Sequence, residues 1–407
     1  MNFENAVASS SVAAETHPHN RLVAKDINPN CIATIVLPVR NEAGFLLKNL
    51  ESFARQVDSH NRPFDSKLFE IIVFANNCDD ESAEIARRWQ RKNKHLNVHV
   101  AEAKICPKNA NIGFVRRWLM SEANDRLRWN RTKGGVILTT DADTAVASDW
   151  LAANLCEIKN GADAVGGRIL IKADELKKMS QKARRFHLLD TDYRLLTAEI
   201  EARLDYIAHD YLPRHHQHFN ASFAVTTAAF ARAGGVPRVR FLEDVAFYQA
   251  LLRVDARFRH SPKVTVETSS RQCGRTEMGL STQIKEWRVM GEKGIKLQAE
   301  CAKAIEGRIR LRKSLRLLWR KVQHYHVFRS EISPIADKLL VNEDFVSNQL
   351  NELQTFGSLY EKILREQART GEWAKKFPDA EVEQSLFNLR NLVKPLRQET
   401  ALAACAL

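Results

Sequence analysis

Short apolar runs alternate with longer amphipathic segments over the first 275 residues of the chain. The apolar runs have the length and the flanking turn residues of buried β-strands. In the segments between them, apolar residues recur every three or four positions, which is typical of helices with one buried face. This alternation predicts an α/β fold with a mostly parallel sheet covered by helices on both faces. The predicted strands lie at 31–39, 69–74, 96–101, 136–138 and 163–171, followed by an extended segment at 219–226 and closing strands at 258–262 and 264–268.

The alternation breaks near residue 172, where a charged segment with helical periodicity predicts an insertion between sheet elements. The first residues mix Ser, Ala, His and Asn without periodicity and predict a flexible leader. The last part of the chain is nearly all helical in pattern. The expected organisation is a leader at 1–30, a main domain at 31–280 with the insertion at about 172–215, and a helical extension at 281–407.

The first two predicted strands lead into polar loops. We expect Pro38 to stop the first strand, Arg40 to lie in a strand-to-helix loop, where α/β proteins bind ligands, and Asn41 to cap the following helix. The second strand leads through Asn76 to Asp80. These Asn and Asp residues indicate a ligand-binding edge, and the alternative is that they only cap the next helix.

Two carboxylates one residue apart, Asp141 and Asp143, directly follow the apolar run at 136–138. In open α/β sheets, ligands bind at the carboxyl ends of the strands. Paired carboxylates at such an end suit a hard divalent cation, Mg²⁺ or Mn²⁺, that also holds phosphate oxygens. The alternative is a solvated turn, because Asp is a common turn residue.

A second acidic pair, Glu243 and Asp244, opens a predicted helix. In one interpretation the pair only interacts with the helix dipole, which is worth less than about 1 kcal/mol. In the other, a carboxylate is a general base that deprotonates a hydroxyl group as the hydroxyl attacks.

Three basic residues in loops are candidates for phosphate contacts. Lys108 precedes a long predicted helix and can reach a phosphate, although an ordinary surface lysine is the more common explanation. Arg271 and Arg275 lie in a polar, glycine-bearing loop after the last predicted strand and can clamp a pyrophosphate.

Composition narrows the class of protein. The chain of 407 residues carries a formal charge of +13, which favours anionic partners such as nucleotides, phosphorylated acceptors, nucleic acid or an anionic membrane. Seven cysteines without a CxxC pair argue against a disulfide framework or a structural zinc site. No secretory signal is recognised and no apolar run approaches the length of a membrane span. We therefore expect a soluble, cytoplasmic protein.

Two segments have two interpretations each. The segment 308–325 is basic and has Leu311 and Leu315 on an apolar stripe. It either makes a peripheral contact with the cytoplasmic face of an anionic membrane or packs on the main domain, and packing is favoured. The histidine-rich tract at 209–218 either binds a metal or contacts an acceptor. Since it lacks a carboxylate at i, i+4 spacing, a metal role is disfavoured.

Taken together, the motifs resemble those of family 2 glycosyltransferases with the GT-A fold. The resemblance covers about residues 31–275 and depends on the order and spacing of elements that are each weak alone. The elements are Leu37–Glu42, the strand and loop with Asp80, Asp141–Asp143, Gly234–Gly235 and Glu243–Asp244.

The resemblance implies transfer of a sugar from a nucleotide-sugar donor to an acceptor hydroxyl, with inversion at the anomeric carbon. Pro38 and Glu42 would line the nucleotide pocket. Asp141 and Asp143 would bind the ribose and the metal ion, with Asp143 the direct ligand of Mn²⁺ or Mg²⁺.

By the same resemblance, Asp244 would be the general base, with Glu243 as its neighbour. One departure concerns the nucleotide, because this chain has Ala75 and Asn76 where the family has an aspartate pair after its second strand. Asn76 can still accept a hydrogen bond from a base, but uridine is no longer specified. The sequence also does not name the sugar or the acceptor, which is a saccharide, a lipid or a small metabolite.

Two other classes compete with this interpretation. A sugar-phosphate nucleotidyltransferase would need a glycine-rich loop with Arg and Lys after its first strand, where this chain has Pro38–Glu42. A non-catalytic, basic nucleic-acid-binding or scaffold protein would need basic and aromatic residues interleaved on one exposed face. The dense basic run at 308–321 has a mostly aliphatic stripe instead. Neither class is favoured, and no nucleic-acid partner is expected.

Overall fold

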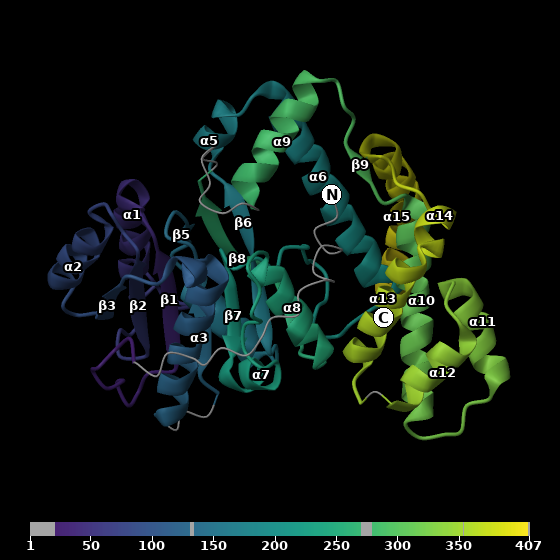
Figure 1. Ribbon diagram of the computed structural model, residues 1–407, viewed down its shortest axis with the longest axis horizontal. Coiled ribbons are helices and arrows are strands. Elements are labelled where there is room, and N and C mark those ends of the chain that lie inside the picture. The colour runs from purple at the N-terminus through teal and green to yellow at the C-terminus, as the bar shows by residue number, and fades with distance from the viewer. Residues whose placement is uncertain (1–20, 131–133, 270–278, 353, 406–407) are drawn as a thin grey trace.

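The computed structural model describes residues 21–130, 134–269, 279–352 and 354–405, with side chains described up to residue 398. The strands of its main sheet are β1 (Ala33–Val39), β2 (Phe69–Asn76), β3 (Asn97–Ala103), β4 (Val136–Thr139), β5 (Ala145–Val146), β6 (Ala164–Ile171), β7 (Phe223–Thr226) and β8 (Phe258–Thr268). They form one eight-stranded sheet in the order β3-β2-β1-β4-β7-β6-β8-β5 (Figure 1). Strands β3, β2, β1 and β4 are parallel, β7 runs antiparallel between β4 and β6, and β8 is parallel to β6. The predicted α/β fold with a mostly parallel sheet is confirmed.

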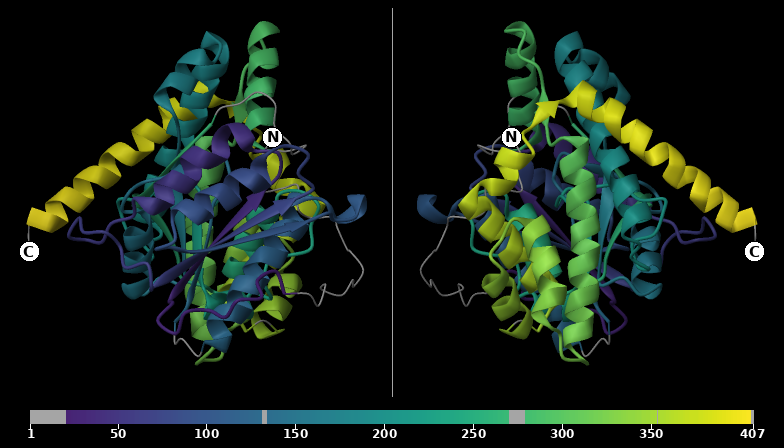
Figure 2. Two further views of the ribbon diagram at one scale, coloured as in Figure 1. Left: turned by 90° about the vertical axis from the view of Figure 1, so that its left-hand side faces the viewer. Right: turned by 90° about the vertical axis from the view of Figure 1, so that its right-hand side faces the viewer.

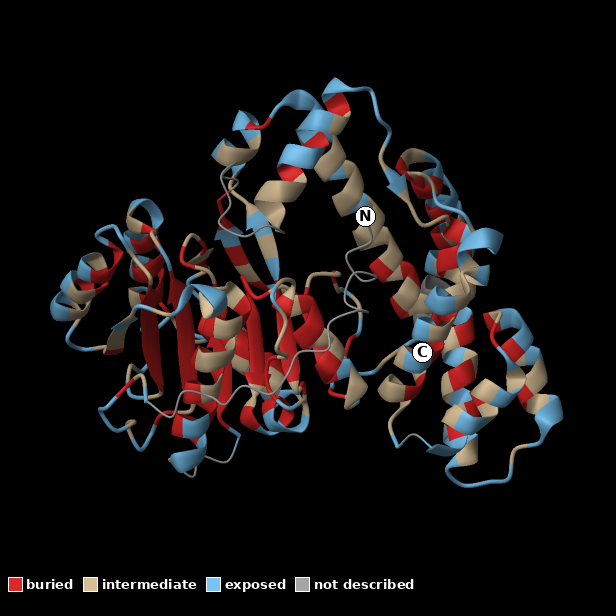
Figure 3. Ribbon diagram, viewed as in Figure 1, coloured by how far each residue is buried: buried red, intermediate tan, exposed pale blue. Residues whose placement is uncertain are grey.

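Helices cover both faces of this sheet. They are α1 (Ala43–Ala54), α2 (Ser82–Lys92) and α4 (Trp150–Lys159) on one face, and α3 (Ile112–Trp129), α7 (Thr227–Arg232) and α8 (Glu243–Arg253) on the other. Phe53 and Trp150 belong to the apolar core of the first face, and Leu119 and Phe247 to the core of the second. Figure 3 shows that the central strands between the two layers are buried along most of their length.

The first strand-to-helix connection differs from the prediction at two residues. Strand β1 does not stop at Pro38 but continues for one residue beyond it. Pairing with β4 ends at Val36, so the N–H that Pro38 lacks removes no hydrogen bond from the β1–β4 pairing. Helix α1 has Glu42, not Asn41, at its N-terminal boundary, and Asn41 adopts a left-handed φ of +53°, a conformation that asparagine tolerates.

The insertion after β6 is helical over a shorter range than predicted. It contains α5 (Ala173–Lys178) and α6 (Gln181–Leu204), and residues 205–222 form an irregular segment. Arg259 of β8 donates hydrogen bonds to the main-chain oxygens of Tyr211 (2.5 Å) and Pro213 (3.0 Å) in this segment. Because a buried guanidinium satisfies these carbonyl groups, the segment needs no helical hydrogen bonds there.

The C-terminal part of the chain is helical, as predicted. It contains α9 (Leu280–Glu292), α10 (Ala302–Val322), α11 (Arg329–Leu339), α12 (Glu343–Glu352), α13 (Phe356–Thr370), α14 (Glu372–Lys376) and α15 (Val382–Cys405), with a short hairpin of β9 (Gln298–Ala299) and β10 (Ala380–Glu381). Helices α9, α10 and α15 pack against α6, and α13 packs against α8. Both views in Figure 2 show α15 extending beyond the body of the molecule at its C-terminal end.

Helix α10 contains residues 308–322 of the basic segment predicted at 308–325. Its apolar stripe is buried against α11, α12 and α13, with Leu311, Leu315 and Leu318 in one core. Two of its arginines, Arg312 and Arg316, pair with carboxylates of α6 and its C-terminal boundary. The stripe is therefore buried within the C-terminal helices, whereas the sequence analysis favoured its packing on the main domain. Among the described residues, no helix combines the length and the apolar character needed to cross a membrane.

Part of the predicted leader lies within the described residues. Residues 21–30 run along α3, where Val23 is buried and the N–H group of Leu22 donates a hydrogen bond to the Glu122 carboxylate (3.2 Å). The Asn130 side chain holds the same segment by donating to the main-chain oxygen of Asn28 (3.1 Å). These residues therefore pack on the second face of the sheet.

Candidate functional site

The predicted ligand-binding loops meet at one edge of the sheet, because β1, β2 and β4 are parallel and end on the same side. Asn76 is buried at the end of β2. Arg40 and Lys108 are exposed on neighbouring loops, and Arg40 Nη1 donates to the main-chain oxygen of Ala110 (3.1 Å). Arg271 and Arg275 lie outside the described residues.

The Asp80 carboxylate holds the starts of two helices. Its Oδ2 accepts a hydrogen bond from the N–H group of Ala43, the first residue of α1, and its Oδ1 accepts from the N–H group of Ser82, the first residue of α2 (both 3.0 Å). The buried residue Glu42 adds a third link, because its N–H group donates to Ser82 Oγ (2.7 Å). The capping interpretation therefore accounts for both carboxylate oxygens of Asp80.

The two aspartates after β4 have different partners. Asp141 Oδ1 accepts a hydrogen bond from Arg116 Nη2 (2.6 Å), and its main-chain oxygen accepts from Asn49 Nδ2 (2.8 Å). Asp143 Oδ2 accepts from Ser269 Oγ, which follows β8 (2.9 Å). Asp141 thus pairs with a guanidinium of α3, and Asp143 is linked to the residue that follows β8.

The second acidic pair lies in the first turn of α8, as predicted. Glu243 is buried, and its Oε1 lies 3.3 Å from Arg116 Nε and 3.4 Å from Asn220 Nδ2. Asp244 is partly exposed, and its Oδ1 accepts a hydrogen bond from the N–H group of Val245 (2.8 Å). Burial, and next the negative charge of Glu243, raise the pKa of the Asp244 carboxyl to about 7. A carboxyl group with this pKa exchanges protons readily near neutral pH.

Arg116 of α3 joins the two acidic pairs, and the sequence analysis missed it. Its side chain is only 2% exposed and pairs with both Asp141 and Glu243. Burial opposes the charge of this guanidinium, but the two carboxylates outweigh burial and raise its pKa above the usual range. A signal was available in the sequence, because Arg116 lies three and four residues before the apolar Leu119 and Met120, on the face of the helix that is buried.

The histidine-rich tract has a structural role. His215 and His218 are buried, and burial lowers the pKa of each imidazole to about 3, so both are neutral. The His218 ring stacks on that of Tyr248, with centroids 4.0 Å apart, one turn after Asp244 in α8. In the part of the chain that the structure describes, no group of three or more His, Cys, Asp or Glu residues could hold a metal ion.

A divalent cation could be bound at this edge by a carboxylate of the protein together with phosphate oxygens of a substrate. Magnesium is commonly bound by one or two carboxylates together with substrate phosphates, without a cage made of protein ligands alone. The Asp143 carboxylate follows a strand at this edge and accepts a hydrogen bond from the Ser269 hydroxyl group, and a carboxylate in this place suits such an arrangement. The pairing of Asp141 with Arg116 departs from the expectation that both aspartates contact the metal.

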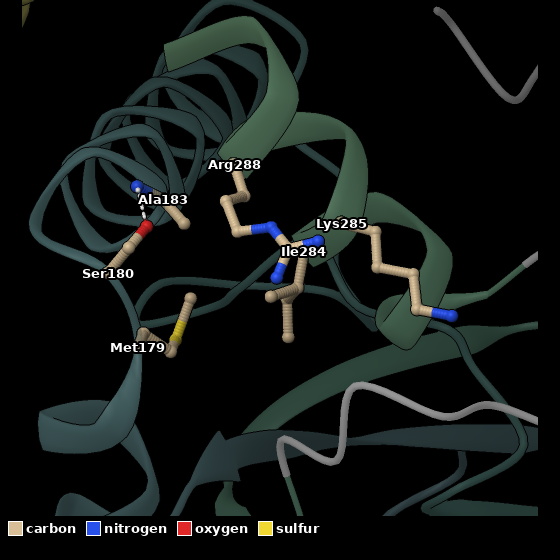
Figure 4. Close-up of a pocket in the computed structure, with 6 residues that line it drawn as sticks. All are labelled: Met179, Ser180, Ala183, Ile284, Lys285 and Arg288. Atoms are coloured by element: carbon tan, nitrogen blue, oxygen red, sulfur yellow. Dashed lines mark hydrogen bonds between the residues drawn. The ribbon is translucent and has the colours of Figure 1, made fainter. Parts of the chain in front are cut away.

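Two cavities lie away from this edge. One of about 10 Å³, large enough for about one water molecule, lies between the start of α6 and helix α9, and Figure 4 shows Met179 and Ile284 facing each other across it. The other, of about 290 Å³, lies beside the start of β2 and is lined by Phe53, Phe64 and Phe69 among others. Neither cavity is lined by any of the four acidic residues, and the second lies where β2 begins, at the opposite edge of the sheet.

Comparisons with known proteins agree with the resemblance seen in the sequence. Residues 34–225 match the family model described as glycosyl transferase family 2, which confirms the resemblance over that range. No curated protein sequence matches the chain.

Several solved structures are similar to this one at low sequence identity. A mannosyltransferase from Pyrobaculum calidifontis, PcManGT, in complex with GDP-Man and Mn²⁺, has 15% identity and a TM-score of 0.40, covering 94% of this chain and 86% of its own. TarS 1–349 from S. aureus in complex with UDP has 13% identity and a TM-score of 0.40, covering 83% and 91%. Glucosyl-3-phosphoglycerate synthase from Mycobacterium tuberculosis has 15% identity and a TM-score of 0.33, covering 66% and 84%.

Proposed function

We propose that this chain, whose residues 34–225 match family 2 glycosyl transferases, transfers a sugar from a nucleotide-sugar donor to an acceptor hydroxyl with inversion. The observation that carries the proposal is that Arg116 pairs with one carboxylate of each acidic motif, Asp141 and Glu243, and so joins the two motifs. Two acidic motifs about 100 residues apart in sequence meet at the edge where open α/β sheets bind ligands.

The donor would bind with its diphosphate next to Asp143. That carboxylate would hold a divalent cation, Mn²⁺ or Mg²⁺, which supplies charge neutralisation for the departing diphosphate. The exposed side chains of Arg40 and Lys108 lie on loops at the same edge and would add positive charge near the phosphates. The buried Asn76 at the end of β2 would contact the base of the nucleotide.

Asp244 would be the general base of a single displacement. The acceptor oxygen forms a bond to the anomeric carbon while the bond from that carbon to the diphosphate oxygen breaks. The acceptor proton passes to the Asp244 carboxylate, and the nucleoside diphosphate leaves with the bonding electron pair. A positioned base of this kind contributes a factor of about 10²–10⁴ to the rate.

The first experiment measures slow hydrolysis of UDP-, GDP- and dTDP-sugars with Mn²⁺, with Mg²⁺ and with a chelator, and nucleotide diphosphate binding by calorimetry. We expect one donor to be hydrolysed only with metal. The Asp143→Ala variant should lose metal-dependent donor binding. The Asp244→Asn variant should keep donor binding and lose about 10²-fold or more in transfer once an acceptor is found.

The outcome that contradicts the proposal is the absence of binding for every nucleotide diphosphate tested, with and without metal. Full transfer activity in the Asp244→Asn variant would reject the base alone and leave the class of reaction in place. Asp192→Ala is a suitable control, because Asp192 lies on α6 with 61% of its side chain exposed and takes no part in the site.

A further inference from the structure

We infer that Arg116 is a positioning residue for the proposed reaction: it fixes Asp141 and Glu243 by pairing with both, and leaves Asp244 as the carboxylate that is free to act on the acceptor. The inference rests on the proposed function and deepens it. No motif of the sequence analysis includes Arg116.

The guanidinium contacts groups from two separate parts of the fold. Nη2 donates to Asp141 Oδ1 (2.6 Å), Nε lies 3.3 Å from Glu243 Oε1, and Nη1 donates to Thr139 Oγ1 in β4 (2.7 Å). A planar guanidinium presents its donors in fixed directions. These contacts therefore set the position of the carboxylate after β4 relative to the first turn of α8.

The backbone around Arg116 is also fixed at close range. A Cβ atom at Gly113 would lie 2.5 Å from the main-chain oxygen of Val239 and 3.4 Å from Glu243 Cβ. The first turn of α3 therefore touches the segment that leads into α8, and only glycine allows this approach. Arg116 follows Gly113 by three residues and lies on the same side of the helix.

Arg116 neutralises two of the nearby carboxylates and not the third. Among the described residues, Arg116 forms ion pairs with Asp141 and Glu243 but not with Asp244. Without the guanidinium, the buried Glu243 carboxylate would lie uncompensated beside Asp244. Removing one partner of a buried pair is strongly unfavourable because the other charge stays buried. Removing Arg116 should therefore first displace the Glu243 carboxylate. Because Glu243 precedes Asp244 in the same turn of α8, the position of the base should then change as well.

The test is a double-mutant cycle between Arg116→Met and Glu243→Gln, with Arg116→Lys as the conservative variant. We expect Arg116→Met to lower kcat by about 100-fold, the scale of losing a positioned base. The double variant should regain at least about tenfold of this loss, because the uncompensated charge is gone. Arg116→Lys should restore part of it, since a lysine keeps the charge but not the fork of donors.

The matched control is Arg117→Met. Arg117 is the next residue in α3, and its guanidinium lies over the Phe114 ring, 5.5 Å from the ring centroid. It has no ion pair with a carboxylate among the described residues. This variant should keep kcat within about twofold of the parent, as expected for a surface cation outside an ion pair.

A second measurement needs no turnover. In urea unfolding, Arg116→Met should lower the midpoint, and the double variant should recover most of that loss. The inference is overturned if Arg116→Met keeps the parent kcat, or if the double variant is neither more active nor more stable than Arg116→Met. If the parent protein binds no nucleotide diphosphate and transfers no sugar, the proposed function fails. If, in that case, the double variant still recovers its urea midpoint, the contact between Arg116 and Glu243 is a structural ion pair. The positioning role is then overturned.

Discussion

At the scale of single residues, the adjacent carboxylates of Glu243 and Asp244 have different surroundings. Glu243 is buried next to a guanidinium, whereas the one hydrogen-bond donor to Asp244 among the described residues is the main-chain N–H group of Val245. Neighbouring titratable groups whose surroundings differ in this way are typical of acid–base sites. The raised pKa of Asp244 is a consequence of this arrangement and can be tested in two ways.

The first test is the pH dependence of kcat/KM, which reports the essential base of the free enzyme. Because Asp244 must be ionised to accept a proton and its pKa is raised to about 7, we expect kcat/KM to fall about tenfold for each pH unit below 7. Above pH 7 the profile should reach a plateau. A profile that is flat between pH 5 and 8 would contradict the assignment of Asp244 as the base.

The second test uses stability and needs no substrate. The folded-state pKa of Asp244 lies above its ordinary value, so the folded protein binds this proton more tightly than the unfolded chain does. That contribution is complete below about pH 4 and is lost as pH rises through about 7. An asparagine at this position cannot ionise, so Asp244→Asn avoids the loss of stability that the parent suffers at high pH. The variant should therefore be more stable than the parent at pH 8. Because the carboxyl group is partly exposed, we expect the difference to be about 1–2 kcal/mol. Below about pH 4 the difference should nearly vanish.

At the scale of elements, the close approach of α3 to the segment before α8 brings the two acidic motifs together. Gly113→Ala would place a Cβ atom 2.5 Å from the main-chain oxygen of Val239. We expect this variant to lose about 1–3 kcal/mol of stability, as overpacked sites do, and to lose activity because the displaced segment carries Asp244. Urea unfolding and the donor assay measure both effects.

Gly44→Ala is the matched control for this prediction. Gly44 lies in the first turn of α1, and a Cβ atom there meets nothing within 4 Å. Replacing a helical glycine by alanine in open space is expected to stabilise the protein by up to about 1 kcal/mol. If both variants changed stability alike, the contact between α3 and the α8 segment would not be tight, and the account of how the motifs meet would be wrong.

At the scale of the whole molecule, α6 connects the sheet domain to the C-terminal helices (Figure 1). Asp205, at the end of α6, is only 2% exposed and accepts hydrogen bonds from Arg312 Nε (2.9 Å) and Arg316 Nη1 (2.5 Å) of α10. Glu201, one turn earlier, also pairs with Arg312. Two arginines of α10, Arg312 and Arg316, thus pair with the end of α6.

Asp205→Ala should therefore destabilise the protein by about 3 kcal/mol, because two buried guanidinium groups lose their shared carboxylate. Asp192→Ala is the control on the same helix, where the side chain is 61% exposed and lies 3.7 Å from Arg390. That change should stay within about 0.5 kcal/mol. Equal effects of the two substitutions on the urea midpoint would show that the charged contact between α6 and α10 contributes little to joining the two parts.

The sequence by itself determined most strands and helices of the sheet domain, though not the short strand β5, and the presence of both acidic motifs. Strand and helix periodicity are local properties, so β1, β2 and α8 could be located from the spacing of apolar residues. The placement of Asp141 and Asp143 after a buried strand, and of Asp244 in a first turn, follows from the same local pattern. The interpretation of Asp80 as a capping residue was available for the same reason.

Only the tertiary structure decided which charges pair and which faces are covered. The antiparallel direction of β7, the contact of Arg116 with Asp141 and Glu243, and the burial of the α10 stripe each depend on residues far apart in the chain. A periodic pattern shows that a face is apolar or that a residue is charged, but it does not name the partner. The partner is set by how the elements pack, and here that packing determines which carboxylate is neutralised and which stays free to act.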